Sequence, residues 1–242
     1  MDSIPKKQRI IEIGGLKLLV IDLTQPLKLD TEVYPGDPKP SREIFSEIGK
    51  TGWHHFIHRV GDHNFQHHAD APNHQNPETQ NGIETFGLEY CFNKAFMIDL
   101  SESGDATKIE GIKYLIEINK RHLEPFSELL SNASAVIIRT GYDLWLEANK
   151  AHTPENLPYL NEAASKYLAS FLNLKVVGID SLTVDKPGFH ISHQSLKDKL
   201  IVESLVNLHQ IPNRLLFDLQ TSPVRIVGAT GGPIVAYAFI GL

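Results

Sequence analysis

The sequence predicts an α/β fold, with a single domain over residues 1–242 in which helices flank a mixed β-sheet. Three observations support this prediction. A chain of 242 residues can bury one substantial core, and its 41% hydrophobic and 21% charged residues are typical of globular proteins. Short β-rich runs also alternate with helix-like segments, which favours at least some parallel strand pairing. No linker, internal repeat or low-complexity segment divides the sequence.

The first predicted element is an N-terminal β-hairpin. Two β-rich runs, IIEI (10–13) and LKLLVIDL (16–23), flank the pair Gly14-Gly15, and two-residue hairpin turns favour such a pair. The next segment, TEVYPGDPKPSRE (31–43), is dense in Pro and Gly, so it is predicted to be a loop.

The rest of the chain is predicted to alternate between strands and helices. Residues 108–130 have apolar side chains at helical spacing, interrupted by Pro125, so two helical pieces are expected there. The segment LNEAASKYLASFL (160–172) is also predicted to be a helix, with Asn161 as its N-cap. The run from Phe56 to Asp70 is a candidate extended segment, and AFMIDLS (95–101) is predicted to be a short buried strand. SAVIIRTGYD (134–143) is predicted to be a strand that ends in a turn, and LKVVGIDSLTVD (174–185) a buried strand that leaves into a loop. Further β-rich runs are RLLFDL (214–219) and VRIVGATGGPIVAYAFIGL (224–242).

Composition narrows the class of partner. The formal net charge of -6 offers no basic surface for nucleic acid or for an anionic membrane, so a small-molecule substrate is the expected partner. No apolar run is long enough to span a membrane, and the N-terminus has no signal-peptide pattern, which indicates a cytoplasmic location. The single cysteine, Cys91, excludes an intramolecular disulfide and a Cys-rich zinc site.

The most informative feature is the histidine distribution, because seven of the twelve histidines lie between His54 and His74. If residues 63–70 form an extended strand, side chains alternate between two faces, so His68 and Asp70 point the same way. An imidazole beside a carboxylate is a mixed ligand pair that suits Zn²⁺, Mn²⁺ or Fe²⁺ better than Ca²⁺ or Mg²⁺. His74 follows just beyond the strand, where a general acid or base is expected.

Structural explanations compete with a metal site. A histidine-rich surface loop is common, and a His-x-Asp pair is frequent by chance. His63 and His67 fall on the opposite face of the expected strand, so a structural role is expected for both. GATGGP (228–233) runs into a β-rich segment, so a tight turn is expected there and not a phosphate-binding loop. The sequence has no G-x-S-x-G motif to indicate a serine triad. A solvated or packing role is expected for the upstream histidines, His54, His55 and His58.

The region around these histidines resembles a known family. The stretch N-F-Q-H-H-A-D-A-P-N-H (64–74) is similar to the signature H-x-G-T-H-x-D-x-P-x-H of the cyclase-type metal-dependent hydrolases, which include bacterial kynurenine formamidase and isatin hydrolase. His68, Asp70, Pro72 and His74 match this signature. Further segments resemble the family in the same order along the chain, namely VIDLTQPL (20–27), VYPGDP (33–38), IIRTGYD (137–143), LNEAASKYLA (160–169), VVGIDSLTVD (176–185) and IVESLVNL (201–208).

The resemblance implies a metal site and a fold. His68 and Asp70 would be ligands of a divalent ion, most readily Zn²⁺ with Mn²⁺ as an alternative, and Asp70 could bridge two ions. His74 would act as a proton shuttle. The implied fold is α/β around a mixed sheet, and the implied assembly is a homodimer or homotetramer.

In the two-metal members of the family, a distant histidine and a glutamate complete the site. The resemblance implies that the glutamate is Glu203 in IVESLVNL. The histidine corresponds to His193 in ISHQSL, with His190 as the alternative.

One departure from the signature affects the ligand set. Asn64 stands where the family has its first histidine ligand, and an amide oxygen is a poorer donor than imidazole to a borderline metal. His63 could replace that ligand only if a bulge swung it round from the other face. The leading hypothesis is metal-dependent hydrolysis of a small amide, formamide, lactam or lactone. The alternative is a small-molecule-binding protein that has kept the scaffold and lost catalysis.

Overall fold

The computed structural model describes residues 7–64, 66–76 and 78–242. The strands of its main sheet are β1 (Gln8–Ile13), β2 (Leu16–Asp22), β5 (His68–Asp70), β6 (Phe92–Asp99), β10 (Ala135–Arg139), β12 (Val176–Ile179), β13 (Leu200–Glu203), β14 (Phe217–Pro223) and β15 (Gly231–Gly241). Within the described residues these strands lie in the order β1-β2-β15-β14-β6-β10-β12-β13-β5. An additional pairing of β5 with β15 closes the strands from β15 to β5 into a barrel.

Smaller elements surround this barrel. Three two-stranded sheets pair β3 (Ser41–Ser46) with β4 (His55–Arg59), β7 (Thr107–Ile109) with β8 (Ile112–Tyr114), and β9 (Glu117–Ile118) with β11 (Tyr159–Leu160). The α-helices are short: α1 (Ile48–Thr51), α2 (Leu88–Cys91), α3 (Lys120–Leu123), α4 (Ser127–Asn132), α5 (Asp143–Glu147), α6 (Glu162–Ala169) and α7 (Ile191–Ser195). In the described parts of the chain, no helix has the length and apolarity needed to cross a bilayer.

The main sheet is mixed, as the sequence predicts. β6, β10, β12 and β13 run parallel to their neighbours in this group, whereas the other pairings of the sheet are antiparallel. Side chains alternate along β10, so Ile137 packs in one hydrophobic core and Val136 packs in another. Helices α3, α4 and α6 cover the second core through Leu123, Leu130 and Leu168. Both faces of the central strands are therefore buried, which explains their continuous apolar runs.

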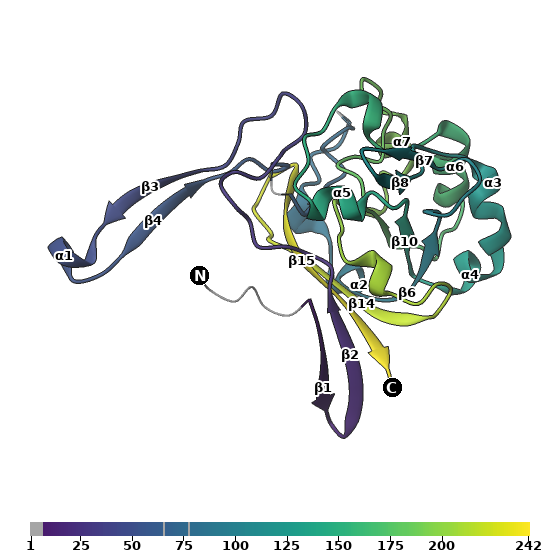
Figure 1. The fold of residues 1–242 in the computed structure, drawn as a ribbon, viewed down its shortest axis with the longest axis horizontal. Coiled ribbons are helices and arrows are strands. Elements are labelled where there is room, and N and C mark those ends of the chain that lie inside the picture. The colour runs from purple at the N-terminus through teal and green to yellow at the C-terminus, as the bar shows by residue number, and fades with distance from the viewer. Residues whose placement is uncertain (1–6, 65, 77) are drawn as a thin grey trace.

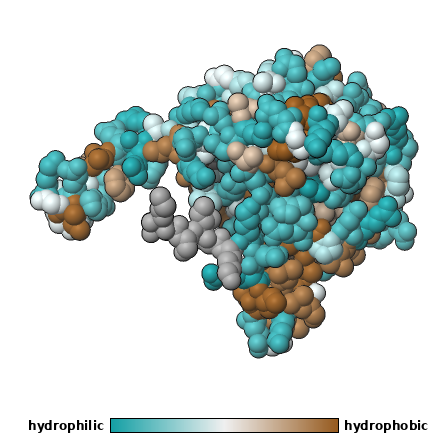
Figure 2. Space-filling model, in the orientation of Figure 1, coloured by the Kyte–Doolittle hydropathy of each residue, from teal (hydrophilic) through white to brown (hydrophobic). Residues whose placement is uncertain are grey.

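The predicted N-terminal hairpin is present. β1 pairs with β2, and Gly14 and Gly15 take positive φ angles of 58° and 82° in the turn between them, a conformation that glycine adopts at no steric cost. β3, α1 and β4 form a second hairpin, the arm (residues 41–59), which projects from the body of the molecule (Figure 1). The predicted loop over residues 31–43 is therefore wrong for its last three residues. Apolar side chains lie on the surface of both hairpins (Figure 2).

The prediction of two helices over residues 108–130 is wrong for the first half of that segment. β7 and β8 pair across a turn at Glu110 and Gly111, both of which have positive φ, and β9 follows. Helices α3 and α4 occupy only the second half, with Pro125 in a single 3₁₀ turn between them. A tight turn thus outweighs the helical spacing of the apolar residues.

Two further predictions meet different outcomes. Asn161 caps α6 as expected, because its Oδ1 accepts a hydrogen bond from Ala164 N at 2.9 Å. The extended run expected from Phe56 to Asp70 is interrupted, because β4 ends at Arg59 and β5 begins only at His68. The residues between these strands that the structure describes follow an irregular path, and this path decides where two of the candidate ligands point.

Candidate metal centre

β5 has only three residues, and it positions two of the predicted ligands. His68 and Asp70 are alternate residues of this strand, and they are 5% and 2% exposed. Their side chains share a face, as expected, with His68 Nε2 3.5 Å from Asp70 Oδ1. β5 pairs with β13 so that His68 lies opposite Glu203, and His68 Nε2 is 3.2 Å from Glu203 Oε2. Strand pairing therefore brings together groups that are far apart in the sequence.

The short helix α7 supplies the distant histidine. His193 Nε2 lies 3.0 Å from Asp70 Oδ2 and 3.6 Å from Glu203 Oε1. Asp185 fixes both the helix and the ring, because its Oδ1 accepts a hydrogen bond from Ser192 N at 2.6 Å and its Oδ2 accepts one from His193 Nδ1 at 2.6 Å. With Nδ1 donating to Asp185, Nε2 is the ring nitrogen that faces the two carboxylates.

The side chains of His63 and Asn64 do not point where a regular strand over residues 63–70 would direct them. Because β5 begins only at His68, His63 is not restricted to the opposite face, and its Nδ1 lies 2.9 Å from Asp70 Oδ1. The side chain of Asn64 instead braces the preceding loop. Its Oδ1 accepts a hydrogen bond from Gly61 N, and its Nδ2 donates to Pro38 O at 2.5 Å. The structure therefore places His63, and not Asn64, beside Asp70.

His74 lies at the entrance to this cluster. Its ring centroid is 3.9 Å from that of His63 and 5.3 Å from that of His193. Burial lowers the pKa of His74 to about 4, although the charge of Asp70 opposes this shift. The amide of Gln75 donates to His74 Nε2 at 3.1 Å. His74 is therefore neutral near pH 7 and can accept a proton.

A pocket of about 260 Å³ opens onto the cluster. His63, His68, His74, His193 and Glu203 line its floor. Its walls include apolar surface and a few polar groups, from Tyr34, Leu182, Lys186, Phe189 and His190. His190, the alternative distant histidine, thus lies on the wall of the pocket just before α7.

The buried groups of the cluster shift one another's pKa values. Burial would raise the pKa of Asp70, but the imidazoles of His193 and His63 outweigh it and hold this pKa well below its usual range. Burial and the charge of Asp70 raise the pKa of Glu203. Burial would lower the pKa of His193, but hydrogen bonds to Asp185 and Asp70 raise it well above its usual value. The carboxylates at the centre of the cluster therefore favour a neighbouring positive charge.

The residues of the cluster fit a divalent ion. His68, Asp70 and Glu203 can each present a ligand atom within 4.8 Å of the others, and so can His63, Asp70 and His74. Among the described residues, His63 Nδ1 and Asp70 Oδ1 are buried atoms that make no hydrogen bond, although they lie 2.9 Å apart. When Nδ1 of the neutral His63 ring carries the lone pair, both atoms are acceptors, and two facing acceptors in a buried position are costly unless a cation lies between them. A mixed set of imidazoles and carboxylates suits Zn²⁺ or Mn²⁺.

The neighbouring histidine, His67, has the structural role that the sequence predicts. It is 5% exposed, its Nδ1 donates to Ser204 O at 2.5 Å, and its Nε2 accepts from Gln25 N at 2.8 Å. Both ring nitrogens therefore make hydrogen bonds, and these connect the loop before β5 to the residues that follow β2 and β13. The remaining clustered histidines lie exposed on or beside β4 of the arm, namely His54, His55 and His58.

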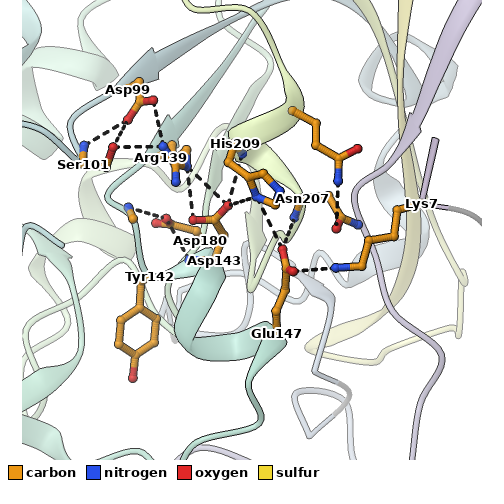
Figure 3. Close-up of polar contacts among 12 residues, drawn as sticks. Lys7, Asp99, Ser101, Arg139, Tyr142, Asp143, Glu147, Asp180, Asn207 and His209 are labelled. Atoms are coloured by element: carbon orange, nitrogen blue, oxygen red, sulfur yellow. Dashed lines mark hydrogen bonds and ion pairs between the residues drawn. The ribbon is translucent and has the colours of Figure 1, made fainter. Parts of the chain in front are cut away.

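A second group of side chains has similar spacing. Asp143, Glu147 and His209 also bring ligand atoms within 4.8 Å of one another (Figure 3). Here the charges are already paired. Arg139 Nε donates to Asp143 Oδ1 at 3.1 Å and His209 Nδ1 to Asp143 Oδ2 at 3.1 Å, while Lys7 Nζ lies 2.5 Å from Glu147 Oε2. In the described part of the chain, none of the buried nitrogen or oxygen atoms of this triad lacks a partner.

Sequence reasoning did not single out the residues that orient the histidines. Asp185 lies at the end of a segment noted only as a strand that leaves into a loop, and it fixes His193. Asp62 and Thr230 lie beside His63, with Thr230 Oγ1 2.9 Å from His63 Nε2. A histidine ligand commonly donates the N–H of its second ring nitrogen to an oxygen acceptor. The sequence therefore predicts that such an acceptor is present, but the fold decides which residue supplies it.

Comparison with known proteins assigns the family. The model of the Cyclase family matches residues 21–186. The chain belongs to the Cyclase family. The match includes His68, Asp70 and His74, whereas His193 and Glu203 lie beyond it and join the cluster through the fold.

Relatives and solved structures agree with this assignment. The Cyclase-family chain is 24% identical to kynurenine formamidase of Bacillus anthracis over 221 residues, which cover 89% of this chain and 95% of the relative. Its fold is similar to that of isatin hydrolase A from Labrenzia aggregata, with a TM-score of 0.74, 19% identity, and coverage of 93% of this chain and 94% of the other. A protein described as a potential metal-dependent hydrolase with cyclase activity gives a TM-score of 0.72 at 22% identity, with coverage of 92% and 98%.

Proposed function

We propose that this Cyclase-family protein is a metal-dependent hydrolase of a small amide, formamide, lactam or lactone. One observation carries the proposal: His68, Asp70, His193 and Glu203 converge, and three of them, His68, His193 and Glu203, line a pocket. Similarity to proteins named kynurenine formamidase and isatin hydrolase supports hydrolysis of a C–N bond.

The four converging residues would hold the metal ion. Zn²⁺ is the ion that this donor set favours, with Mn²⁺ as the alternative. Bound there, the ion would polarise the substrate carbonyl and lower the pKa of a water molecule toward about 7. Asp185 keeps His193 in the required orientation by accepting a hydrogen bond from its Nδ1. Val184 N donates to Glu203 Oε1 at 2.7 Å and fixes that carboxylate in the same way.

His74 would move the proton. Its neutral imidazole accepts a proton from the attacking water and returns it to the leaving nitrogen or oxygen, a contribution of about 10²- to 10⁴-fold in rate. Gln75 donates to Nε2, so this nitrogen carries the lone pair of the neutral ring, and the water must replace the Gln75 amide there to give up its proton. The closeness of His74 to His63 and His193 supports this position beside the reacting atoms.

The pocket favours a compact substrate. Its volume of about 260 Å³ lies just below the usual range for small-molecule sites, about 300–1,000 Å³. Leu182 and Phe189 give it apolar walls, and Lys186 adds a cation. These features favour a single ring or short acyl group over an extended chain.

The test compares His74→Ala with the wild-type protein. We expect His74→Ala to bind Zn²⁺ in the wild-type amount, measured by elemental analysis after loading, and to lose about 10²- to 10⁴-fold in the rate of hydrolysis of an arylformamide or lactam. Wild-type turnover by this variant would contradict the role of His74.

The turned side chain of Asn64 favours a second candidate function, a small-molecule-binding protein without catalysis. The family's first ligand position is used here to brace a loop. Wild-type protein that cannot be loaded with Zn²⁺ or Mn²⁺ would support this function over the hydrolase.

A homodimer is the proposed assembly, with a homotetramer as the larger alternative. On the arm, Ile44, Phe45, Ile48 and Trp53 are 48–62% exposed. A two-stranded hairpin is at best marginally stable alone, so a second copy of the chain would cover this surface. Replacing Ile44 and Phe45 by Ser should shift the protein to monomer in sedimentation experiments, whereas the same change at the exposed Leu172 should not. An unchanged dimer in the arm variant would exclude the arm as the interface.

A further inference from the structure

His63 is held from both sides by groups outside the proposed ligand set. On one side, its Nε2 lies 2.9 Å from Thr230 Oγ1. Thr230 is in turn bound to Asp62, whose Oδ2 is 2.9 Å from Thr230 N and 3.0 Å from Thr230 Oγ1. On the other side, His63 Nδ1 faces Asp70 Oδ1 at 2.9 Å.

The donor and acceptor in each hydrogen bond between Asp62, Thr230 and His63 follow from the protons that these groups carry. An ionised carboxylate only accepts, so Thr230 must use its single hydroxyl proton to donate to Asp62. The hydroxyl oxygen of Thr230 is then free only to accept, and its partner is the Nε2–H of His63. In the neutral ring, Nδ1 consequently carries a lone pair, and this lone pair faces Asp70.

We propose that Asp62 and Thr230 are positioning residues that hold His63 in its Nε2–H tautomer, so that His63 Nδ1 supplies the imidazole ligand that Asn64 cannot supply. This inference rests on the proposed metal-dependent function. It assigns to residues 62, 63 and 230 a role that the family signature does not contain, because this chain has Asn at the first ligand position.

The backbone beside His63 is shaped for this arrangement. Gly231 begins β15 and pairs with Asp70, and a Cβ atom at this position would lie 2.5 Å from His63 Cε1 and 2.8 Å from Ala69 O. Glycine thus leaves the space that the imidazole occupies. Thr230 is anchored in the same region because its O accepts from Ala71 N at 2.9 Å, so the positioning hydroxyl and the metal-facing strand form one rigid unit.

The arrangement around His63 parallels that around His193. Each ring directs one nitrogen to an oxygen acceptor, Thr230 in one case and Asp185 in the other, and its second nitrogen to a carboxylate oxygen of Asp70. Asp70 therefore receives one imidazole at each of its two oxygens. Such outer partners typically change metal affinity by about 10- to 100-fold when they are removed.

Two substitutions of Thr230 separate the hydroxyl from the shape of the side chain. Thr230→Val keeps the branched shape and removes the hydroxyl, whereas Thr230→Ser keeps the hydroxyl. We expect Thr230→Val to bind Zn²⁺ about 10- to 100-fold more weakly than wild type, measured by competition with a chelator, and Thr230→Ser to bind nearly as wild type. The exposed arm substitution His58→Ala is the control for weak binding to surface histidines and should leave Zn²⁺ affinity unchanged.

A spectroscopic readout tests the tautomer without metal. At about pH 8, above the ordinary histidine pKa of about 6.5, the nitrogen chemical shifts of His63 in the metal-free wild type should show Nε2 protonated and Nδ1 unprotonated. Thr230→Val should show a mixture of tautomers, and Thr230→Ser should restore the wild-type pattern. His63→Ala provides the assignment of the signals.

The outcomes distinguish this inference from the proposed function. Wild-type Zn²⁺ affinity in both Thr230→Val and His63→Ala, or an Nδ1–H tautomer in the wild type, would overturn the inference and leave the hydrolase proposal intact. A wild-type protein that binds no Zn²⁺ would instead overturn the proposed function. Weaker binding by Thr230→Val together with rescue by Thr230→Ser would support the positioning role.

Discussion

This protein has two clusters in which histidine and carboxylate groups lie at similar distances, one around Asp143 and one around Asp70. They differ in the groups that face the central carboxylate. Around Asp143, an arginine and a histidine donate to the carboxylate, and it is 0% exposed. Around Asp70, three imidazoles surround the carboxylate, yet in the described residues its Oδ1 and the facing Nδ1 of His63 make no hydrogen bond. The charges of the first cluster are paired by an arginine, whereas the side chains of the second fit an additional cation.

The difference shows that donor type and spacing are insufficient to identify a metal site. Both clusters satisfy the same distance criterion, but Arg139 already supplies the positive charge beside Asp143 and also binds Asp99 at 2.8 Å (Figure 3). A buried polar atom without a partner is unusual in folded proteins and marks a place where a ligand or ion belongs. Asp70 Oδ1 and His63 Nδ1, which make no other hydrogen bond within the described residues, are therefore stronger evidence for a metal site than the number of histidines.

The largest effect is expected from Asp70→Asn. The neutral amide would replace the carboxylate that faces His63, His68 and His193, so Zn²⁺ affinity should fall by more than the roughly 100-fold attributed to outer partners. Competition with a chelator measures this change. Asp143→Asn is the matched control and should bind Zn²⁺ as wild type does. Similar losses in the two variants would mean that the two clusters do not differ in metal binding.

A loss of stability in the absence of metal is expected for Asp143→Asn. Asp143→Asn leaves the guanidinium of the buried Arg139 with Asp99 as its remaining carboxylate partner, and removal of one member of a buried ion pair costs about 3 kcal/mol or more. Urea unfolding of the metal-free proteins should show this loss. Metal-free Asp70→Asn should also unfold below the wild-type midpoint, because the imidazoles that hold the pKa of Asp70 low stabilise its ionised form. Equal midpoints for Asp143→Asn and wild type would refute the structural role of the Asp143 cluster.

Local chemistry predicted the parts of the site that lie close together in the sequence. His68 and Asp70 share a face because a strand alternates, and three residues of β5 are enough for that argument to hold. Glu203 and His193 could be named only through family resemblance, because strand pairing and the packing of α7 bring them to Asp70. Of the two candidate histidines, His193 lies beside Asp70 and is held there by Asp185, a contact that no sequence spacing encodes.

The errors arose where a regular element was assumed to continue. His63 was predicted to lie on the opposite face of a regular strand over residues 63–70, whereas β5 starts at His68. The helical spacing in residues 108–130 was overridden by a turn at Glu110 and Gly111. In both places a local break in the backbone, which pattern analysis cannot locate, decides where the side chains point.

A smaller effect is expected from Asp180, which lies beside Asp143 and should make the stability of the protein depend on pH. Asp180 accepts hydrogen bonds from Thr140 and Gly141, but burial and the charge of Asp143 raise its pKa to about 7. An unfolded Asp has a pKa of about 3.9, so between about pH 4 and pH 7 the folded state binds the proton more tightly. The contribution of Asp180 to wild-type stability should therefore fall as pH rises through this window, by up to about 1.4 kcal/mol per pH unit. Urea unfolding at a series of pH values should show that Asp180→Asn lacks this slope, even if its stability is lower throughout, and a slope retained in the variant would assign the proton to another group.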